Sequence, residues 1–171
     1  MIKKTRAFIC GISGYNLKKS EVSFLKKYKP WGIILFSRNI KSINQVQKLT
    51  GSIKKIFKNS NYPILIDEEG GRVSRLRKFI DNSIFSAKYF GDLYSKDRKK
   101  FDIYFNVYVK QISYLLRLIG ININTVPVLD LRRNKSHKII GDRSFSNDKK
   151  TLSKIGDISI EKFHENRVGT V

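Results

Sequence analysis

The sequence predicts an α/β protein with a parallel sheet, and three observations support this prediction. Short apolar runs alternate with segments of helical periodicity. The runs are nearly continuous instead of alternating with polar residues, which is typical of strands buried on both faces of a sheet. Four strand–helix units and the beginning of a fifth follow one another without a linker or an internal repeat. We therefore expect a single domain over residues 1–171.

The first part of the chain predicts two strand–helix units and a third strand. A helix is expected from Lys19 to Tyr28, where Pro30 prevents it from continuing. A second helix is expected over residues 43–57, because apolar side chains recur on one stripe: Val46, Leu49, Ile53 and Ile56. The expected strands are residues 7–13, 32–37 and 63–67.

The second part contains the clearest helix signal. A helix is expected from Arg98 to Ile119, ended by Gly120, because apolar side chains recur with i, i+4 and i+7 spacing. These side chains are Phe101, Phe105, Tyr108, Ile112, Leu115 and Ile119. A shorter helix is expected near residues 84–95, and another after Asp148. The segment 121–130 is expected to be a fourth strand that runs into a loop, and residues 167–171 are expected to begin a fifth strand.

Two closed architectures fit this order of elements: a doubly wound sheet of five strands, and a (β/α)8 TIM barrel of which this chain is the N-terminal half. Val168 and Val171 resemble the beginning of a buried strand, and a complete domain seldom ends there. The pattern therefore favours a half-barrel, truncated at the fifth strand. Its two open sheet edges and uncovered apolar faces are expected to cause aggregation or to require a partner.

The composition excludes several classes of protein. With 40% hydrophobic and 12% aromatic residues, the chain has the material for a core, which excludes a disordered or fibrous protein. Cys10 is the single cysteine, which excludes an internal disulfide and fits a reducing compartment. No apolar run has the length of a membrane span, and no signal-peptide pattern is found. We therefore expect a cytoplasmic protein without a membrane partner.

The net charge of +21 calls for a comparison with nucleic-acid-binding proteins. Residues 1–66 contain 14 basic residues and one acid, Glu21, whereas residues 67–171 contain 21 basic and 13 acidic residues. The excess is mostly lysine, spread over expected helix faces, without an arginine-rich run or interleaved aromatic residues. Solvated helix faces are therefore favoured, and a functional basic surface is the alternative.

The segment IDEEGGRVSRL, residues 66–76, carries the most informative chemistry. Three acids and two glycines follow an expected strand, where a barrel strand opens onto the active-site face. The glycines permit a tight turn and a close approach to a ligand. Arg72 and Arg75 bring guanidinium groups back over the carboxylates, and this mixture of donors and acceptors suits a neutral, hydroxyl-rich ligand. A structural ion pair between Asp67 and an arginine explains the spacing equally well.

A second polar constellation follows the fourth expected strand. Asp130 ends that strand, and Asp142 and Arg143 lie in a polar turn that presents the arginine. The alternative is a simple loop ion pair between these two neighbours. His137 and His164 are expected at the surface. We assign no metal site and no cofactor.

Four motifs occur in the order and spacing of one known family: GIILFSRNI, IDEEGGRVSRL, INTVPVLD and IIGDRSFSND. On these motifs the whole chain resembles the N-terminal half of the catalytic barrel of glycoside hydrolase family 3. It is most similar to the bacterial cytoplasmic β-N-acetylglucosaminidases, or β-hexosaminidases, of cell-wall recycling. The resemblance implies a glycosidase that removes non-reducing terminal N-acetylglucosamine from peptidoglycan (muropeptide) fragments.

The resemblance also implies roles for particular residues. Asp67 is implied to hydrogen-bond sugar hydroxyls at the non-reducing end, and Arg75 and Arg143 to line the same substrate-binding site. The implied reaction is hydrolysis with retention, through an aspartate nucleophile and a covalent glycosyl intermediate. In this subfamily a histidine held by an aspartate replaces the usual second carboxylate. Because strand alternation turns Glu68 away from Asp67, we expect replacement of Glu68 to be the milder change.

The family's catalytic motifs cannot be placed in residues 1–171. In the family, the strand that begins here at Val168 continues into a K-H-[FI]-P-G-H-G motif, followed by the histidine loop and the nucleophile. We therefore expect no catalytic residue in this chain and no activity of the chain alone. Three hypotheses follow: a fragment of a glycosidase, one half of a split enzyme completed by a second polypeptide, or a non-enzymatic basic protein that binds nucleic acid or an anionic surface.

Overall fold

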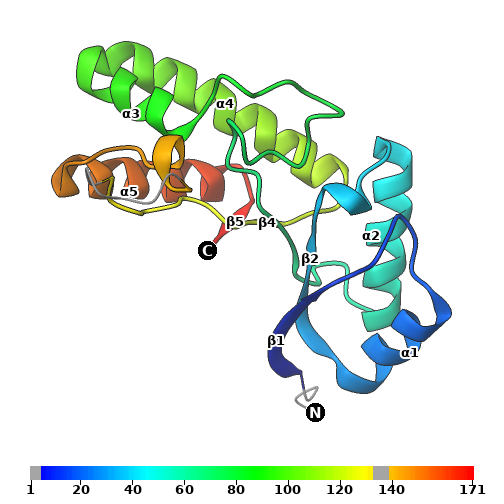
Figure 1. The fold of residues 1–171 in the computed structure, drawn as a ribbon. Coiled ribbons are helices and arrows are strands. Elements are labelled where there is room, and N and C mark those ends of the chain that lie inside the picture. Colours follow the sequence, from blue (N-terminus) through cyan, green and yellow to red (C-terminus); the bar gives the residue numbers. More distant parts are fainter. Residues whose placement is uncertain (1–4, 133–138) are drawn as a thin grey trace.

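The computed structural model describes residues 5–132 and 139–171, and it confirms the predicted α/β class (Figure 1). Parallel strands alternate with helices along the described chain; His137 lies outside the described residues. The strands are β1 (Arg6–Gly11), β2 (Pro30–Leu35), β3 (Ile64–Ile66), β4 (Ile123–Asn124) and β5 (Gly169–Thr170). The helices are α1 (Lys19–Tyr28), α2 (Ile43–Phe57), α3 (Ala87–Lys96), α4 (Arg98–Leu118) and α5 (Lys149–Glu165), with 3-10 turns at Ser37–Asn39 and Gly141–Arg143.

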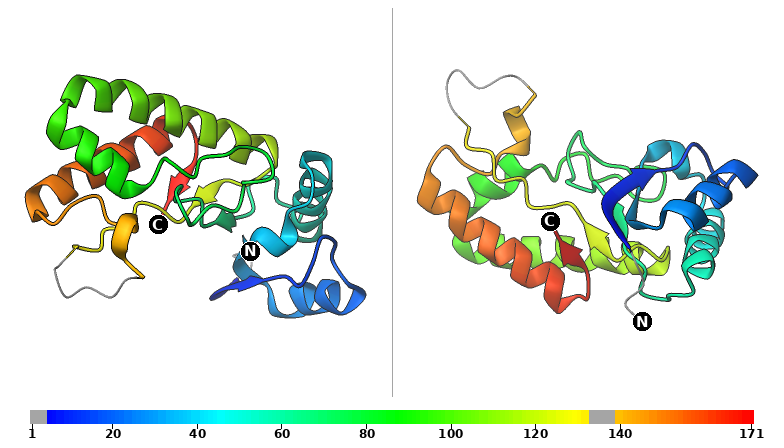
Figure 2. Two further views of the ribbon diagram at one scale, coloured as in Figure 1. Left: turned by 45° about the horizontal axis from the view of Figure 1, so that its top comes forward. Right: turned by 90° about the horizontal axis from the view of Figure 1, so that it is seen from below.

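The five strands form one parallel sheet whose spatial order is the order of the chain, β1-β2-β3-β4-β5. A doubly wound sheet reverses its strand order at a switch point, whereas a barrel does not. The observed order is therefore that of the half-barrel. The sheet is not closed, and β1 and β5 form its two edges (Figure 2).

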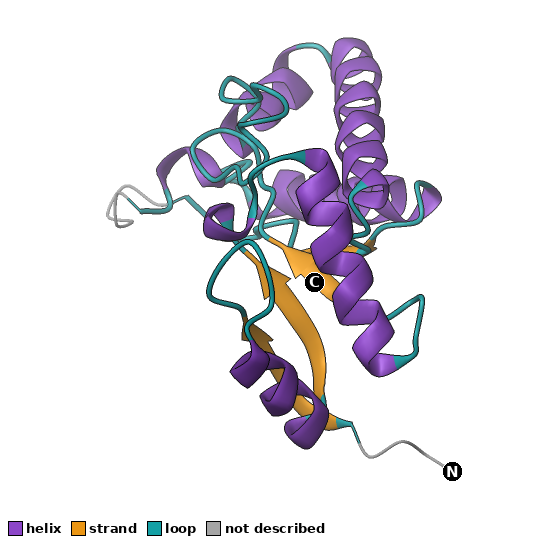
Figure 3. Ribbon diagram, turned by 90° about the vertical axis from the view of Figure 1, so that its right-hand side faces the viewer, coloured by secondary structure: helices purple, strands orange, loops and turns teal. Residues whose placement is uncertain are grey.

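The core lies between the sheet and the helices. Figure 3 shows the helices beside the strands in a view at right angles to that of Figure 1. Four isoleucine and leucine side chains of β2 and β3 are fully buried against the apolar stripe of α2: Ile33, Leu35, Ile64 and Ile66. Alternate strand residues face the other side of the sheet. There Ile9 of β1, in register with Gly32, is 44% exposed. The side of β1 that faces away from the helices is therefore open to solvent.

An aromatic cluster joins α3 to α4 and to the segment that precedes α5. Phe90 lies at its centre, with ring centroids 4.9 to 6.5 Å from five neighbours: Phe85, Tyr89, Phe101, Phe105 and Tyr108. Gly91 permits this packing, because a Cβ atom at this position would lie 1.7 Å from the carbonyl oxygen of Phe145. The cluster thus fixes the turn that carries Arg143 against α3.

The segment 121–130, expected to be a strand that runs into a loop, forms the two-residue strand β4 and then leaves the ladder. Pairing ends before Pro127, which has no N–H to donate. Side-chain amides replace the missing ladder bonds. The Asn122 side chain accepts a hydrogen bond from the Ile64 N–H at 2.8 Å. The Asn124 side chain pairs with both the N–H and the carbonyl oxygen of Glu68 at 2.9 Å. Two asparagines therefore hold β3 at both of its ends.

Candidate functional site

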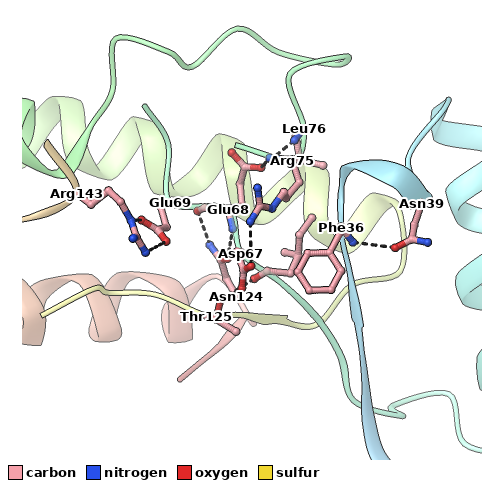
Figure 4. Close-up of polar contacts among 11 residues, drawn as sticks. Phe36, Asn39, Asp67, Glu68, Glu69, Arg75, Leu76, Asn124, Thr125 and Arg143 are labelled. Carbon is pink, nitrogen blue, oxygen red and sulfur yellow. Dashed lines mark hydrogen bonds and ion pairs between the residues drawn. The ribbon is translucent and has the colours of Figure 1, made fainter. Parts of the chain in front are cut away.

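Asp67 lies directly after β3, at the carboxyl end of the sheet (Figure 4). Its Oδ1 accepts a hydrogen bond from Thr125 Oγ1 at 2.6 Å, and its Oδ2 forms an ion pair with Arg75 Nη2 at 3.1 Å. The Asp67 and Arg75 side chains are 24% and 26% exposed. Two of the three predicted sugar-site residues are thus adjacent and accessible. The same contact is also the Asp–Arg ion pair that the structural alternative expects.

Phe36, directly after β2, lies beneath two guanidinium groups. The Cζ atoms of Arg75 and Arg38 lie 5.8 and 4.6 Å from its ring centroid. The buried Asn39 holds this loop in place. Its Oδ1 accepts a hydrogen bond from the Phe36 N–H at 2.9 Å, and its Nδ2 donates to the carbonyl oxygen of Ile12 at 3.1 Å. The loops after β1 and β2 are therefore joined next to Arg75.

Glu68 points away from Asp67, as strand alternation predicts, and enters a buried network. Its Oε2 accepts hydrogen bonds from the backbone N–H groups of Arg75 and Leu76 at 2.7 and 2.9 Å, and its Oε1 accepts one from Asn82 Nδ2 at 2.7 Å. Burial raises the pKa of this carboxyl, and the hydrogen bonds oppose the shift. Glu68 thus fixes the backbone of Arg75, whose side chain forms the ion pair with Asp67. Its role in this structure is therefore to hold the loop, and the expectation that its replacement affects activity less than that of Asp67 stays a prediction.

Arg143 forms its ion pair with Glu69 of the segment 66–76, and not with its neighbour Asp142. Its Nε and Nη2 donate to the two carboxylate oxygens of Glu69, each at 2.8 Å. These hydrogen bonds raise the pKa of the Arg143 guanidinium. Asp142 instead pairs with Arg72 Nε at 2.7 Å, so the alternative of an Asp142–Arg143 ion pair is wrong. Two arginine–carboxylate pairs therefore anchor this turn to the segment after β3.

The two glycines of the motif form the predicted tight turn, with φ of +83° at Gly70 and +57° at Gly71. A Cβ atom at Gly70 would lie 2.3 Å from the carbonyl oxygen of Phe85 and 2.5 Å from the hydroxyl of Tyr108. The close approach that these glycines permit is therefore to the protein's own loop and to α4. Any larger residue at Gly70 would displace the turn that carries Glu69.

A cavity of about 20 Å³ lies beside the Glu69–Arg143 pair, enclosed by apolar side chains of α3, α4 and α5. It has room for one water molecule and not for a sugar ring. Among the described residues, no cluster of three or more potential metal ligands occurs, and no helix has the length and apolar character needed to cross a membrane.

Sequence analysis missed three contributors to this site: Phe36, Asn124 and Thr125. The alternation of asparagine with isoleucine in ININ, residues 121–124, was a usable signal, because a buried strand seldom carries polar side chains without a partner. Thr125 is the first residue after that alternation. Phe36 gave no separate signal, since its ring continues the apolar run of β2.

A family model, the glycosyl hydrolase family 3 N terminal domain, matches residues 3–171. The chain belongs to glycosyl hydrolase family 3. Its curated relatives include the beta-hexosaminidase of Xanthomonas campestris pv. campestris (strain B100), which is 28% identical over 161 residues, covering 94% of this chain and 47% of the relative. Beta-hexosaminidase A of Pseudoalteromonas piscicida is 30% identical over 143 residues, covering 81% of this chain and 23% of the relative.

Solved family 3 structures share the fold. Native NagZ from Neisseria gonorrhoeae matches with a TM-score of 0.83 and 25% identity, covering 97% of this chain and 48% of NagZ. A family 3 beta-N-acetylglucosaminidase from Paenibacillus sp. str. FPU-7 matches with a TM-score of 0.77 and 25% identity, covering 95% of this chain and 30% of that enzyme. This family 3 chain thus spans about half the length of the Xanthomonas relative and of NagZ.

Proposed function

We propose that this chain is the sugar-binding half of a cytoplasmic β-N-acetylhexosaminidase of peptidoglycan recycling, which removes non-reducing terminal N-acetylglucosamine from muropeptide fragments. One observation carries the proposal: Asp67 lies at the carboxyl end of β3, partly exposed, and is oriented by Thr125 and Arg75. Relatives named beta-hexosaminidase support the reaction class. NagZ in complex with N-trifluoroacetyl-D-glucosamine supports an amino sugar of this kind as ligand.

The proposed binding uses the donors and acceptors that the ion pairs leave available. Each oxygen of Asp67 has one partner among the described residues, so each can accept a further hydrogen bond from a sugar hydroxyl. A guanidinium has five N–H donors, of which Arg143 uses two on Glu69. The remaining donors of Arg143, and the Nη donors of Arg75 that Asp67 does not use, are available for sugar oxygens, whereas the Nε of Arg75 is buried. Each such bond to a charged group contributes about 1.5–3 kcal/mol.

The proposed reaction is retaining hydrolysis, in which an aspartate nucleophile forms a covalent glycosyl intermediate that water then resolves. We assign neither this nucleophile nor the acid/base histidine to a residue of this chain. The carboxylate of Glu68 is buried and accepts three hydrogen bonds, so it does not reach a sugar. A second polypeptide that pairs with the β1 and β5 edges would supply the remaining strands of a (β/α)8 barrel and the catalytic groups.

The test combines this chain with the C-terminal half of gonococcal NagZ, produced as a separate polypeptide, and measures hydrolysis of an aryl N-acetyl-β-D-glucosaminide. Gel filtration first establishes that the two halves form a complex. We expect no turnover by the chain alone and turnover by the complex. Loss of two charged hydrogen bonds in Asp67→Ala, about 3–6 kcal/mol, is expected to lower the activity of the complex about a hundredfold or more.

Asp92→Ala is the matched control, because this exposed carboxylate on α3 pairs only with the neighbouring Lys88 among the described residues. It is expected to leave turnover unchanged. Turnover by the chain alone, abolished in Asp67→Ala, would contradict the absence of catalytic groups. An active complex with undiminished turnover in Asp67→Ala would contradict the assigned sugar site.

A further inference from the structure

Basic side chains pair with acidic side chains in the second part of the chain, but not among the described ones of its first 66 residues. All seven ion pairs of the described residues join side chains that follow residue 66. Glu21, the one acid among residues 1–66, accepts hydrogen bonds from the backbone N–H groups of Ser13 and Lys18 at 2.8 Å. Within the described part of this region, the lysines of α1 and α2 therefore have no carboxylate partner. Uncompensated charge of one sign repels itself and attracts anions.

These lysines surround a groove between α1 and α2, which pack side by side (Figure 1). The groove has a volume of about 580 Å³. No acidic side chain of the described residues lines the groove. Its rim carries four exposed lysines: Lys26, Lys48, Lys55 and Lys58. Its floor is apolar, with the half-buried side chains of Val22 from α1 and Ile56 from α2. The surface is therefore concave, apolar at the centre and positive on both sides.

We propose that this groove binds an acidic amphipathic helix of a partner protein. A helix of that kind places an apolar face on the floor and carboxylates against the lysine rims, as in other helix-in-groove complexes. A membrane surface does not enter a concave groove. A nucleic acid would set phosphates and sugars over an apolar floor, and neither arginine nor an aromatic ring for base stacking lines this groove. Charge complementarity and the apolar floor together favour the acidic helix.

This inference does not depend on the proposed glycosidase function. The groove lies in the outer helical layer, between α1 and α2, whereas Asp67 lies at the carboxyl end of β3. Asp67→Ala is therefore expected to leave binding in the groove unchanged. Conversely, loss of groove binding does not test the sugar site.

The experiment measures fluorescence anisotropy of labelled probes with the whole chain. The main probe is a synthetic helix with a leucine face flanked by glutamates. A peptide of the same composition in scrambled order and a single-stranded oligonucleotide of equal charge serve as comparison probes. We expect the helix to bind more tightly than both. The triple variant Lys48→Gln, Lys55→Gln, Lys58→Gln is expected to weaken helix binding about tenfold, since each rim ion pair contributes about twofold to threefold.

The matched control removes the same charge elsewhere, in the triple variant Lys99→Gln, Lys150→Gln, Lys154→Gln on α4 and α5, where all three lysines are exposed. It is expected to leave helix affinity within about twofold. Equal losses in the two triple variants would reduce the effect to net charge and overturn the proposal. Equal affinity for the scrambled peptide, tighter binding of the oligonucleotide, or no binding of the helix would overturn it as well. Circular dichroism checks that both variants retain the fold.

Discussion

Replacing Glu68 with alanine removes the acceptor for three buried or half-buried donors: the backbone N–H groups of Arg75 and Leu76, and the amide of Asn82. The two backbone N–H groups cannot reach another acceptor without unwinding the loop. Each buried donor without an acceptor costs about 1–3 kcal/mol. Release of the buried carboxylate from its desolvation offsets part of this cost. We therefore expect a net loss of about 2–4 kcal/mol in the free energy of unfolding, out of about 5–15 kcal/mol for an ordinary domain.

Glu68→Gln is the matched control, because its amide oxygen can accept both backbone hydrogen bonds while the side chain keeps its shape. We expect it to lose about 1 kcal/mol or less. Urea unfolding of the chain measures both variants, followed by the fluorescence of Trp31, the single tryptophan, which lies in β2. A loss below about 0.5 kcal/mol in Glu68→Ala, or equal losses in both variants, would refute the reasoning from unpaired donors.

Three further predictions concern the same segment. Because burial raises the pKa of Glu68, the folded protein holds a proton on this carboxyl at pH values just above the ordinary pKa of a glutamate, where the unfolded chain has lost it. The stability of the natural protein relative to Glu68→Gln is therefore expected to fall as the pH rises through these values. Urea unfolding between about pH 4.5 and 7 measures this difference. Gly70→Ala is expected to cost about 2 kcal/mol or more, because its φ is +83° and its Cβ atom would contact the carbonyl oxygen of Phe85. Gly51→Ala, in an open position of α2, is instead expected to stabilise the chain by about 0.5–1 kcal/mol, and a reversed order of these two glycine variants would contradict the argument. Arg75→Lys is expected to lower turnover of the complex with the NagZ half, because a point charge cannot replace a planar fork of donors, and retention of full turnover would exclude Arg75 from the sugar site.

The elements that local patterns specify could be predicted from the sequence. The expected helix from Lys19 to Tyr28 and that over residues 43–57 agree with α1 and α2, because Pro30 marked the end of the first and an apolar stripe marked the second. The point at which β4 gives way to the loop could not be predicted, because the apolar run continues beyond the end of main-chain pairing. Periodicity indicates which face of a segment is buried. It does not indicate over how many residues the neighbouring strand stays within hydrogen-bonding distance.

The candidate site could be predicted only where its residues lie close in the sequence. Asp67 and Arg75 share one motif, and the structure brings them together. Thr125 lies 58 positions from Asp67, and Glu69 lies 74 positions from Arg143, so these pairs depend on how the strands are arranged. Sequence adjacency suggested an ion pair between Asp142 and Arg143, but the tight turn directs the two side chains to different partners. Tertiary contacts of this kind leave no local pattern.

The asparagines at the two ends of β3 have a consequence for how the chain avoids misfolding. The isoleucines of the segment 121–124 alternate with them, so a shift of two residues would exchange one isoleucine for another and leave the apolar pattern unchanged. The side-chain amides distinguish the two alignments. In the native alignment Asn122 and Asn124 contact opposite ends of β3, and in the shifted one an amide loses its partners inside the protein. An unpaired buried amide is costly, so a misaligned β3–β4 pair is rejected even though each strand contributes so few ladder bonds. Polar atoms, and not apolar ones, thus encode the alignment that places Asp67 next to Thr125.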